Sequence, residues 1–257
     1  PPLSLLYVAT ILQKAGHDVV FIDGGAERDR FRSLLEKGCD AEVIIASTST
    51  MTVNEDAQNL GKIRQNSPGV PPIGMVFGTH PTFLPQETLS RPGIDIAILG
   101  DPEDIVAEFL EKKALGGESW KSVQGIAFRD HGKVVINNSR PVDRNLDRLP
   151  YPNRSLLPDH DYFNPVVKHY PYTVAVTSRG CIGKCVFCTV PRLYPNIIKV
   201  RSAENVLGEL EIVLNEGYRE VFFRDETFTM FRKRNEQICK EIIHRGWKLG
   251  WICNGRL

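Results

Sequence analysis

Residues 172–188 read YTVAVTSRGCIGKCVFC, and this stretch decides the fold of the 257-residue chain. Its opening residues, 172–177, are apolar or β-branched and predict a buried strand. The loop that follows holds three cysteines within eight residues, Cys181, Cys185 and Cys188. Barrels and open α/β sheets carry their chemistry on loops at the carboxyl ends of strands. The stretch therefore predicts a parallel α/β fold with metal or redox chemistry at one strand end.

The β/α alternation continues on the carboxyl side of this loop. We expect helices at 203–215 and 231–245 and strands at 220–224 and 248–253. With the first strand they make three β/α steps over residues 172–257. Three parallel strands are few for a free-standing layer, which predicts a truncated partial (β/α) barrel whose later repeats are missing.

Residues 1–119 predict a doubly wound, Rossmann- or flavodoxin-like α/β domain. Apolar runs alternate with helical patterns, as in a parallel sheet covered on both faces. The expected strands are 17–23, 41–46, 72–77 and 94–99, and the expected helices are 3–16, 31–37, 55–65, 85–90 and 103–114. Residues 120–171 break this rhythm with a hairpin and then a polar, proline-bearing stretch, and we interpret them as a hairpin and linker between two domains.

Composition excludes several classes of function. The 32 basic and 31 acidic residues give a net charge of +1, so no overall field favours a nucleic-acid partner. No run approaches the roughly 18 apolar residues that predict a membrane span, and we expect a cytoplasmic protein. The chain begins at Pro1 and ends after an apolar run. We therefore expect it to be a piece of a longer protein that lacks the opening strand of its first domain.

The spacing of the cysteines separates three interpretations of the loop. A structural zinc site takes four ligands, and no fourth Cys or His lies near the loop in the sequence. Chance clustering of core cysteines fits poorly, because the loop is rich in Arg, Gly and Lys. A four-iron cluster held by three cysteines leaves one iron open, as a catalytic centre requires. Cys39, Cys239 and Cys253 are expected to be ordinary small core residues.

The segment CIGKCVFC, residues 181–188, resembles the CxxxCxΦC signature of the radical S-adenosylmethionine (SAM) superfamily, with Phe187 as the aromatic residue. The resemblance implies that Cys181, Cys185 and Cys188 hold a 4Fe-4S cluster whose open iron binds SAM. One electron from the reduced cluster would then cleave SAM to a 5'-deoxyadenosyl radical. In such enzymes the cofactor carries the hard chemistry and the protein supplies ligation, orientation and exclusion of water.

By the same resemblance, further residues at strand ends of the partial barrel bind SAM, together with Phe187. Asp225 or Glu226 would receive the ammonium group, and Arg256 the carboxylate. The alternative is that these carboxylates pair with neighbouring arginines at a helix entrance.

The first domain resembles the cobalamin-binding domain that precedes the radical SAM barrel in one large subclass, and the linker motif LDRLPYPNRSLLP, residues 146–158, resembles its connector. The implied fold is a doubly wound cobalamin-binding domain followed by a truncated radical SAM partial (β/α) barrel. The implied cobalamin-binding residues lie at strand ends: Ser47, Thr48, Gly78, Thr79, His80, Gly100, Asp101 and Glu103. The corrinoid motif DxHxxG does not occur, so we expect His80 to make a loop hydrogen bond instead of ligating cobalt.

The resemblance implies a cobalamin-dependent radical SAM enzyme, most simply a methyltransferase acting on an unactivated carbon. One SAM would supply the methyl group and a second the radical. Formation or rearrangement of a ring is the first alternative, and a non-catalytic corrinoid or iron–sulfur sensor is the second. The missing fourth cysteine argues against the sensor. The expected partners are a small-molecule substrate and an electron donor such as flavodoxin or ferredoxin.

Overall fold

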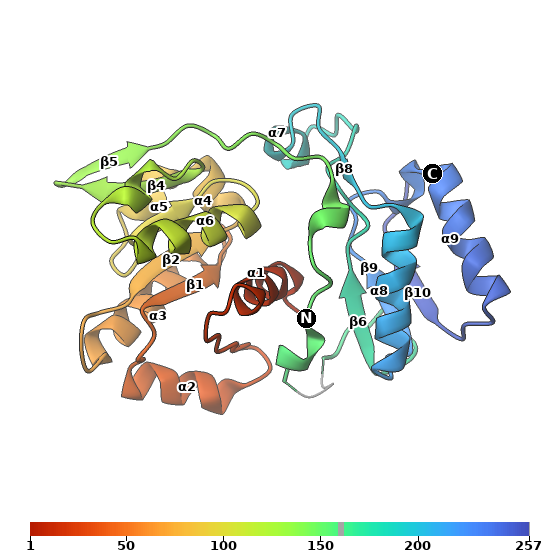
Figure 1. The fold of residues 1–257 in the computed structure, drawn as a ribbon, viewed down its shortest axis with the longest axis horizontal. Helices are drawn as coiled ribbons and strands as arrows, with labels where there is room; N and C mark the ends of the chain where they lie inside the picture. Colours follow the sequence, from red (N-terminus) through yellow and green to blue (C-terminus); the bar gives the residue numbers. More distant parts are fainter. Residues whose placement is uncertain (159–161, 257) are drawn as a thin grey trace. The chain divides into compact units, whose positions relative to one another are not determined.

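The structure of the chain, a computed structural model, describes residues 1–158 and 162–256. Two compact units follow one another along the chain, one formed by residues 2–141 and the other from residue 142 onward (Figure 1). The division falls inside the segment 120–171 that was expected to link two domains. No helix among the described residues is long and apolar enough to cross a membrane.

The N-terminal unit is built on a five-stranded mixed sheet of order β1-β2-β3-β4-β5 (Figure 1). The strands are β1 (Val43–Ser47), β2 (Ile73–Phe77), β3 (Ile96–Ile98), β4 (Ile126–Asp130) and β5 (Lys133–Ile136). The first three are parallel, and the expected hairpin, β4 with β5, adds to them antiparallel to β3. The hairpin thus completes this sheet instead of belonging to a linker.

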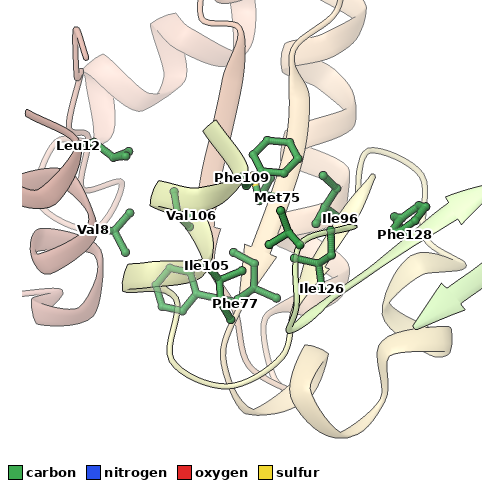
Figure 2. Packing of buried hydrophobic residues seen from close by; sticks show 12 residues of the cluster. Val8, Leu12, Met75, Phe77, Ile96, Ile105, Val106, Phe109, Ile126 and Phe128 are labelled. Carbon is green, nitrogen blue, oxygen red and sulfur yellow. The ribbon is translucent and has the colours of Figure 1, made fainter. Parts of the chain in front are cut away.

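Helices cover both faces of this sheet. They are α1 (Leu3–Lys14), α2 (Arg28–Lys37), α3 (Val53–Asn66), α4 (Thr79–Phe83), α5 (Pro85–Leu89), α6 (Glu103–Ala114) and the short 3-10 helix η1 (Ser119–Ser122). Met75 and Phe77 of β2 pack in one cluster with α1 and α6, whose Phe109 is fully buried (Figure 2). Val76, between them, packs in a second cluster with α3 and α5. Neighbouring residues of a strand point to opposite faces of the sheet, so both faces of β2 are covered by helices. This confirms the doubly wound arrangement.

Residues 17–23, expected as a strand, form none in the structure. Their burial does alternate, since Val19 packs against the core and Phe21 is buried while Val20 is 68% exposed. A strand also needs a neighbour with which to exchange backbone hydrogen bonds, and none of the described strands pairs with this segment. The expectation of a buried strand was therefore wrong both in the strand itself and at Val20, although Val19 and Phe21 do pack inward.

The C-terminal unit contains a parallel sheet of order β10-β9-β6 (Figure 1). Its strands are β6 (Tyr172–Ala175), β9 (Glu220–Phe223) and β10 (Gly250–Cys253), and its long helices are α8 (Ala203–Asn215) and α9 (Arg232–His244). Leu210 of α8 and Ile238 of α9 pack in one cluster with Val221 and Phe223 of β9. Burying each such side chain contributes about 1.5–3 kcal/mol. The three expected β/α steps are present.

Short elements complete this unit around the cysteine loop. They are η2 (Leu146–Arg148), η3 (Arg154–Leu156), β7 (Ser178–Arg179), α7 (Val190–Leu193), β8 (Lys199–Val200) and η4 (Phe228–Met230). Strands β7 and β8 pair antiparallel, with Arg179 opposite Lys199, so the two ends of the cysteine loop lie side by side. Residues 146–158 of the expected linker belong to this unit, where Asn145 and Asn153 cap η2 and η3 through their side chains.

Candidate functional site

The root of the cysteine loop is fixed by Asp225, the second residue after β9. Its fully buried carboxylate accepts hydrogen bonds from Thr177 N at 2.6 Å, from the Thr177 hydroxyl, and from Ser178 Oγ at 2.6 Å. Because β6 and β9 are parallel neighbours, with Ala175 opposite Phe223, their carboxyl ends meet at one edge of the sheet. The sequence placed Asp225 at this edge, but not its bonds to the loop root.

Glu226 contacts the loop one step further along. Its Oε2 accepts the backbone N–H of Gly180 at 3.0 Å. Burial raises the pKa of Glu226 above its ordinary value, although the backbone hydrogen bonds act against the rise. Gly180 has φ +97°, and a Cβ there would lie 2.4 Å from the carbonyl oxygen of Ile197, so only glycine fits. The loop thus begins with a backbone N–H bonded to the Glu226 carboxylate. A nearby cation would stabilise the ionised form of this carboxylate.

The three cysteines of the loop carry free thiols and are half-buried. Cys181 Sγ accepts the N–H of Gly183 at 3.3 Å and lies 3.5 Å from Thr227 Oγ1. Cys188 N donates to Cys185 O at 3.1 Å in a turn. Within the described residues no group of three or more His, Cys, Asp or Glu side chains is gathered around one point as a metal ion would require. The donor set suits an iron–sulfur cluster, but the loop would have to close further around one.

Apolar side chains of the loop face outward. Ile182 is 72% exposed and Phe187 88% exposed, and Val186 is fully exposed. Phe187, predicted to bind SAM, therefore makes no part of the packed core.

Arg256, which follows β10, lies against the cysteine loop. Its backbone N–H donates to Thr229 Oγ1 at 3.3 Å, and a Cβ on Gly183 would meet Arg256 Nη1 at 2.7 Å. Asn254 Nδ2 donates to the carbonyl oxygen of Asp225 at 3.0 Å, which ties the end of β10 to that of β9. The structure therefore brings Arg256, Glu226 and the cysteine loop close together.

Two arginines that the sequence analysis missed also hold the loop root. Arg234 donates from Nη1 to Thr177 O at 2.9 Å and from Nη2 to Thr177 Oγ1 at 2.8 Å, and lies 4.0 Å from the Asp225 carboxylate. Burial lowers the pKa of Arg234, and Asp225 partly offsets this. The backbone N–H of Arg201 also donates to Thr177 O, at 2.9 Å. A local sequence pattern could not show these contacts, because both arginines are far from residue 177 in the chain.

A buried ion triad holds the former linker on this unit. Glu209 of α8 lies between Arg154 and Arg201, and all three side chains are at most 3% exposed. Burial alone would raise the pKa of Glu209. The two arginines together lower the pKa by more than burial raises it, so the pKa lies below the ordinary value. Arg154 also donates to Thr173 Oγ1 at 3.0 Å and to Val174 O at 3.0 Å. The triad therefore links η3, β6 and α8.

The predicted cobalamin-binding residues of the N-terminal unit lie at the carboxyl ends of β1, β2 and β3. Thr48 is buried and donates from Oγ1 to Asp56 Oδ2 at 2.6 Å, whereas Ser47 and Thr79 are exposed. Thr82 Oγ1 donates to Gly78 O at 2.7 Å and accepts Gly100 N at 3.0 Å. The loops after β2 and β3 are therefore joined at this edge.

The two glycines at this edge differ. A Cβ on Gly78, at φ +133°, would lie 2.1 Å from Thr48 O, whereas nothing lies within 4 Å of a Cβ on Gly100, at φ +98°. Gly78 is thus required by backbone packing, and open space lies beside Gly100. Asp101 is half-buried and Glu103 buried, the latter at the first residue of α6. Space next to polar side chains and a glycine is compatible with a ligand such as a corrinoid.

His80 is 3% exposed, and its Nδ1 lies 3.3 Å from Thr50 Oγ1. This is a loop hydrogen bond of the kind predicted. Among the described residues, its Nε2 is the one buried side-chain polar atom without a hydrogen-bond partner, and Glu87 Oε1 lies 3.9 Å away.

Comparisons with known proteins match a different family to each of the two units. Residues 1–110 match the B12 binding domain family, and residues 175–257 match the Radical SAM superfamily. An uncharacterized methyltransferase of Pyrococcus horikoshii is 34% identical, with 100% of this chain covering 55% of that protein. The anaerobic magnesium-protoporphyrin IX monomethyl ester cyclase of Cereibacter sphaeroides is 28% identical, with 100% of this chain covering 43% of the cyclase.

Among solved structures, the radical S-adenosylmethionine methyltransferase TsrM of Kitasatospora setae shares the fold, with a TM-score of 0.75. The two are 17% identical, and the match covers 95% of this chain and 48% of TsrM. The chain thus spans about half the length of the known proteins it matches.

Proposed function

Because this chain belongs to the radical SAM proteins that carry a B12-binding domain, we propose that Cys181, Cys185 and Cys188 hold a 4Fe-4S cluster and that Glu226 and Arg256 bind SAM. One observation carries the proposal. Glu226 accepts Gly180 N on the cysteine loop, while Arg256 lies against Gly183 of the same loop. An acidic and a basic side chain therefore contact the loop on either side of Cys181, and such a pair suits the ammonium and carboxylate groups of SAM.

When bound, the cluster and SAM supply reductive cleavage of a C–S bond, which yields the 5'-deoxyadenosyl radical. The chain's own residues bind and orient. Glu226 faces the ammonium group, whose positive charge stabilises a carboxylate that burial has made costly to ionise. Arg256 would hold the carboxylate of SAM, and Phe187, which is exposed beside Cys188, would be available to contact SAM. This geometry favours Glu226 over Asp225 as the residue that receives the ammonium group.

For the N-terminal unit we propose a bound cobalamin at the carboxyl edge of its sheet. The exposed hydroxyls of Ser47 and Thr79 suit hydrogen bonds to the amide arms, and the space beside Gly100 suits close backbone approach. His80 supports this edge through Thr50 and does not ligate cobalt. Thr48, Gly78, Asp101 and Glu103 complete the proposed site, the first two by shaping its backbone.

The proposed reaction is methylation of an unactivated carbon of a small molecule, supported by a relative that is named a methyltransferase and matches along the whole chain. Ring formation is the second candidate, because a cyclase also matches along the whole chain at 28% identity. We further propose a ferredoxin or flavodoxin as electron donor, and a cytoplasmic location, where six free cysteines would stay reduced.

Anaerobic reconstitution of the full-length protein with iron, sulfide, cobalamin and SAM tests the proposal. We expect 5'-deoxyadenosine and S-adenosylhomocysteine by mass spectrometry once a methyl-accepting substrate is present. Methyl-deuterated SAM separates the two candidates, because only a methyltransferase carries the label into its product. A protein that binds the cluster but forms neither SAM-derived product would contradict the proposed function.

A further inference from the structure

Two consecutive acids, Asp225 and Glu226, contact the same loop in different ways. Asp225 is 0% exposed and accepts three hydrogen bonds, all from Thr177 and Ser178. Glu226 is half-buried and accepts Gly180 N. Since Cys181 follows Gly180 directly, the two acids fix the backbone immediately before the first cysteine.

The environment of Asp225 is already complete without a ligand. Both carboxylate oxygens accept hydrogen bonds from the loop root, and the Arg234 guanidinium lies 4.0 Å away as a countercharge. Arg234 in turn donates to both the carbonyl and the hydroxyl oxygen of Thr177. A ligand ammonium group that reached Asp225 would have to displace these contacts, and uncovering them would leave buried polar groups unpaired.

Thr177 is the point at which these contacts meet. Its N–H and hydroxyl donate to Asp225, and its carbonyl oxygen accepts from Arg234 and from the backbone of Arg201. Three separate groups, the Asp225 carboxylate, the Arg234 guanidinium and the Arg201 backbone N–H, thus hold one residue just after β6. A residue held in this way transmits little motion, so the cysteine loop starts from a fixed position and direction.

We infer that Asp225 is a positioning residue that fixes the root of the cysteine loop through Thr177 and Ser178, while Glu226 alone of the two acids meets SAM. The inference rests on the proposed function for the role of Glu226. The claim that Asp225 fixes the loop root does not depend on that function and applies with or without a bound cluster. Substitution of the two acids therefore has different main consequences: loss of Asp225 releases the loop root at Thr177 and Ser178, and loss of Glu226 weakens SAM binding.

The test measures iodoacetamide labelling of each cysteine by mass spectrometry in the cluster-free, full-length protein. Asp225→Asn keeps an acceptor for Thr177 N but places an amide NH2 against the hydroxyls of Thr177 and Ser178. We expect labelling of the three loop cysteines to rise about tenfold, as loss of hydrogen bonds to a charged acceptor allows. Cys239 of α9 reports on unfolding of the same unit, and its rate should not change.

Variants of Thr177 provide the matched pair. Thr177→Val removes the hydroxyl at nearly constant shape and should raise loop labelling, whereas Thr177→Ser retains it and should restore the wild-type rate. Unchanged loop labelling in both Asp225→Asn and Thr177→Val would overturn the inference. If Cys239 labelling rises as well, Ser178→Ala, which removes a single hydrogen bond, decides between loop release and unfolding.

SAM affinity per reconstituted cluster is the second measurement. We expect Asp225→Asn to keep that affinity within about twofold and Glu226→Gln to lose about tenfold or more, as expected for a charge-assisted contact. The reverse order would show that Asp225 is the SAM ligand. Failure of the wild-type protein to bind a cluster would refute the proposed function and leave the labelling result for Asp225 intact.

Discussion

The two units place polar residues at the same location, the carboxyl edge of three parallel strands, but with different chemistry. In the N-terminal unit this edge is held by hydroxyls and close backbone packing, as Thr48, Thr82 and Gly78 show. In the C-terminal unit it is held by buried charge, with Asp225 and Arg234 at its centre. Hydroxyls and backbone groups suit hydrogen bonds to a large ligand with amide arms, whereas a buried ion pair suits a site for a small zwitterion and a cluster. One architecture therefore supports two recognition chemistries.

The largest expected effect is the loss of the cluster when a cysteine of the loop is replaced. Replacing Cys181, Cys185 or Cys188 by alanine should abolish cluster absorption in the visible region and all 5'-deoxyadenosine formation, because each thiolate is a proposed ligand of the cluster. Iron content and mass spectrometry measure the two losses. Cys39→Ala and Cys239→Ala, outside the loop, should leave both unchanged. SAM cleavage by the triple alanine variant would contradict the assignment.

The next effect concerns the stability of the C-terminal unit. Glu209→Ala would leave Arg154 and Arg201 buried without their shared carboxylate. Removing one partner of a buried ion pair costs about 3–5 kcal/mol, so urea unfolding of this unit should shift to lower concentration. Glu211→Ala, on the same helix but in an exposed pair with Arg245, should cost about 0–1 kcal/mol. Equal losses would mean that the triad is not buried in solution.

A smaller effect distinguishes the two glycines at the carboxyl edge of the N-terminal sheet. Gly78→Ala places a Cβ 2.1 Å from Thr48 O, in addition to an unfavourable φ, and should destabilise the N-terminal unit by more than the roughly 1–3 kcal/mol of backbone strain alone. Gly100→Ala meets only the strain. Thermal unfolding measures both. If Gly100→Ala instead weakens cobalamin binding at little cost in stability, the open space beside Gly100 is the ligand's.

The pH dependence of the charged edge is expected to be modest. Burial raises the pKa of Glu226 in the folded protein, so the folded state holds the proton more tightly than the unfolded state does. Stability should therefore decrease as pH rises from the ordinary carboxyl pKa, about 4.3, to the raised one, and stay lower above it. Glu226→Gln should remove this decrease in the cluster-free protein. An unchanged pH profile would show that Glu226 is solvated.

The last prediction is that His80 does not bind cobalt, so that replacing it changes nothing in the spectrum of bound cobalamin. With cobalamin bound, electron paramagnetic resonance of the cob(II)alamin form should show no nitrogen splitting from a protein imidazole, because His80 is bonded to Thr50 within its loop. His80→Ala should give the same spectrum. A splitting that disappears in His80→Ala would restore histidine ligation and show that the N-terminal edge supplies more than hydroxyl and backbone contacts.

Local patterns predicted most of the helices and strands, and the family resemblance pointed to Glu226 and Arg256 as neighbours of the cysteine loop. They failed where structure depends on a distant partner. Residues 17–23 place Val19 and Phe21 inward, but no described strand pairs with them. The β4–β5 hairpin pairs with β3, and nothing in the hairpin sequence indicates this partner. Likewise, nothing near Arg154 or Arg234 in the sequence indicates which buried groups they contact.

The pairing of β7 with β8 has an entropic consequence for cofactor assembly. Because Arg179 lies opposite Lys199, residues 180–198 form a loop whose ends are closed by the protein itself. Closing a loop of this length costs about 2–3 kcal/mol, and folding meets that cost before any iron arrives. Metal binding then has only to order the interior of the loop, so more of its free energy remains as affinity.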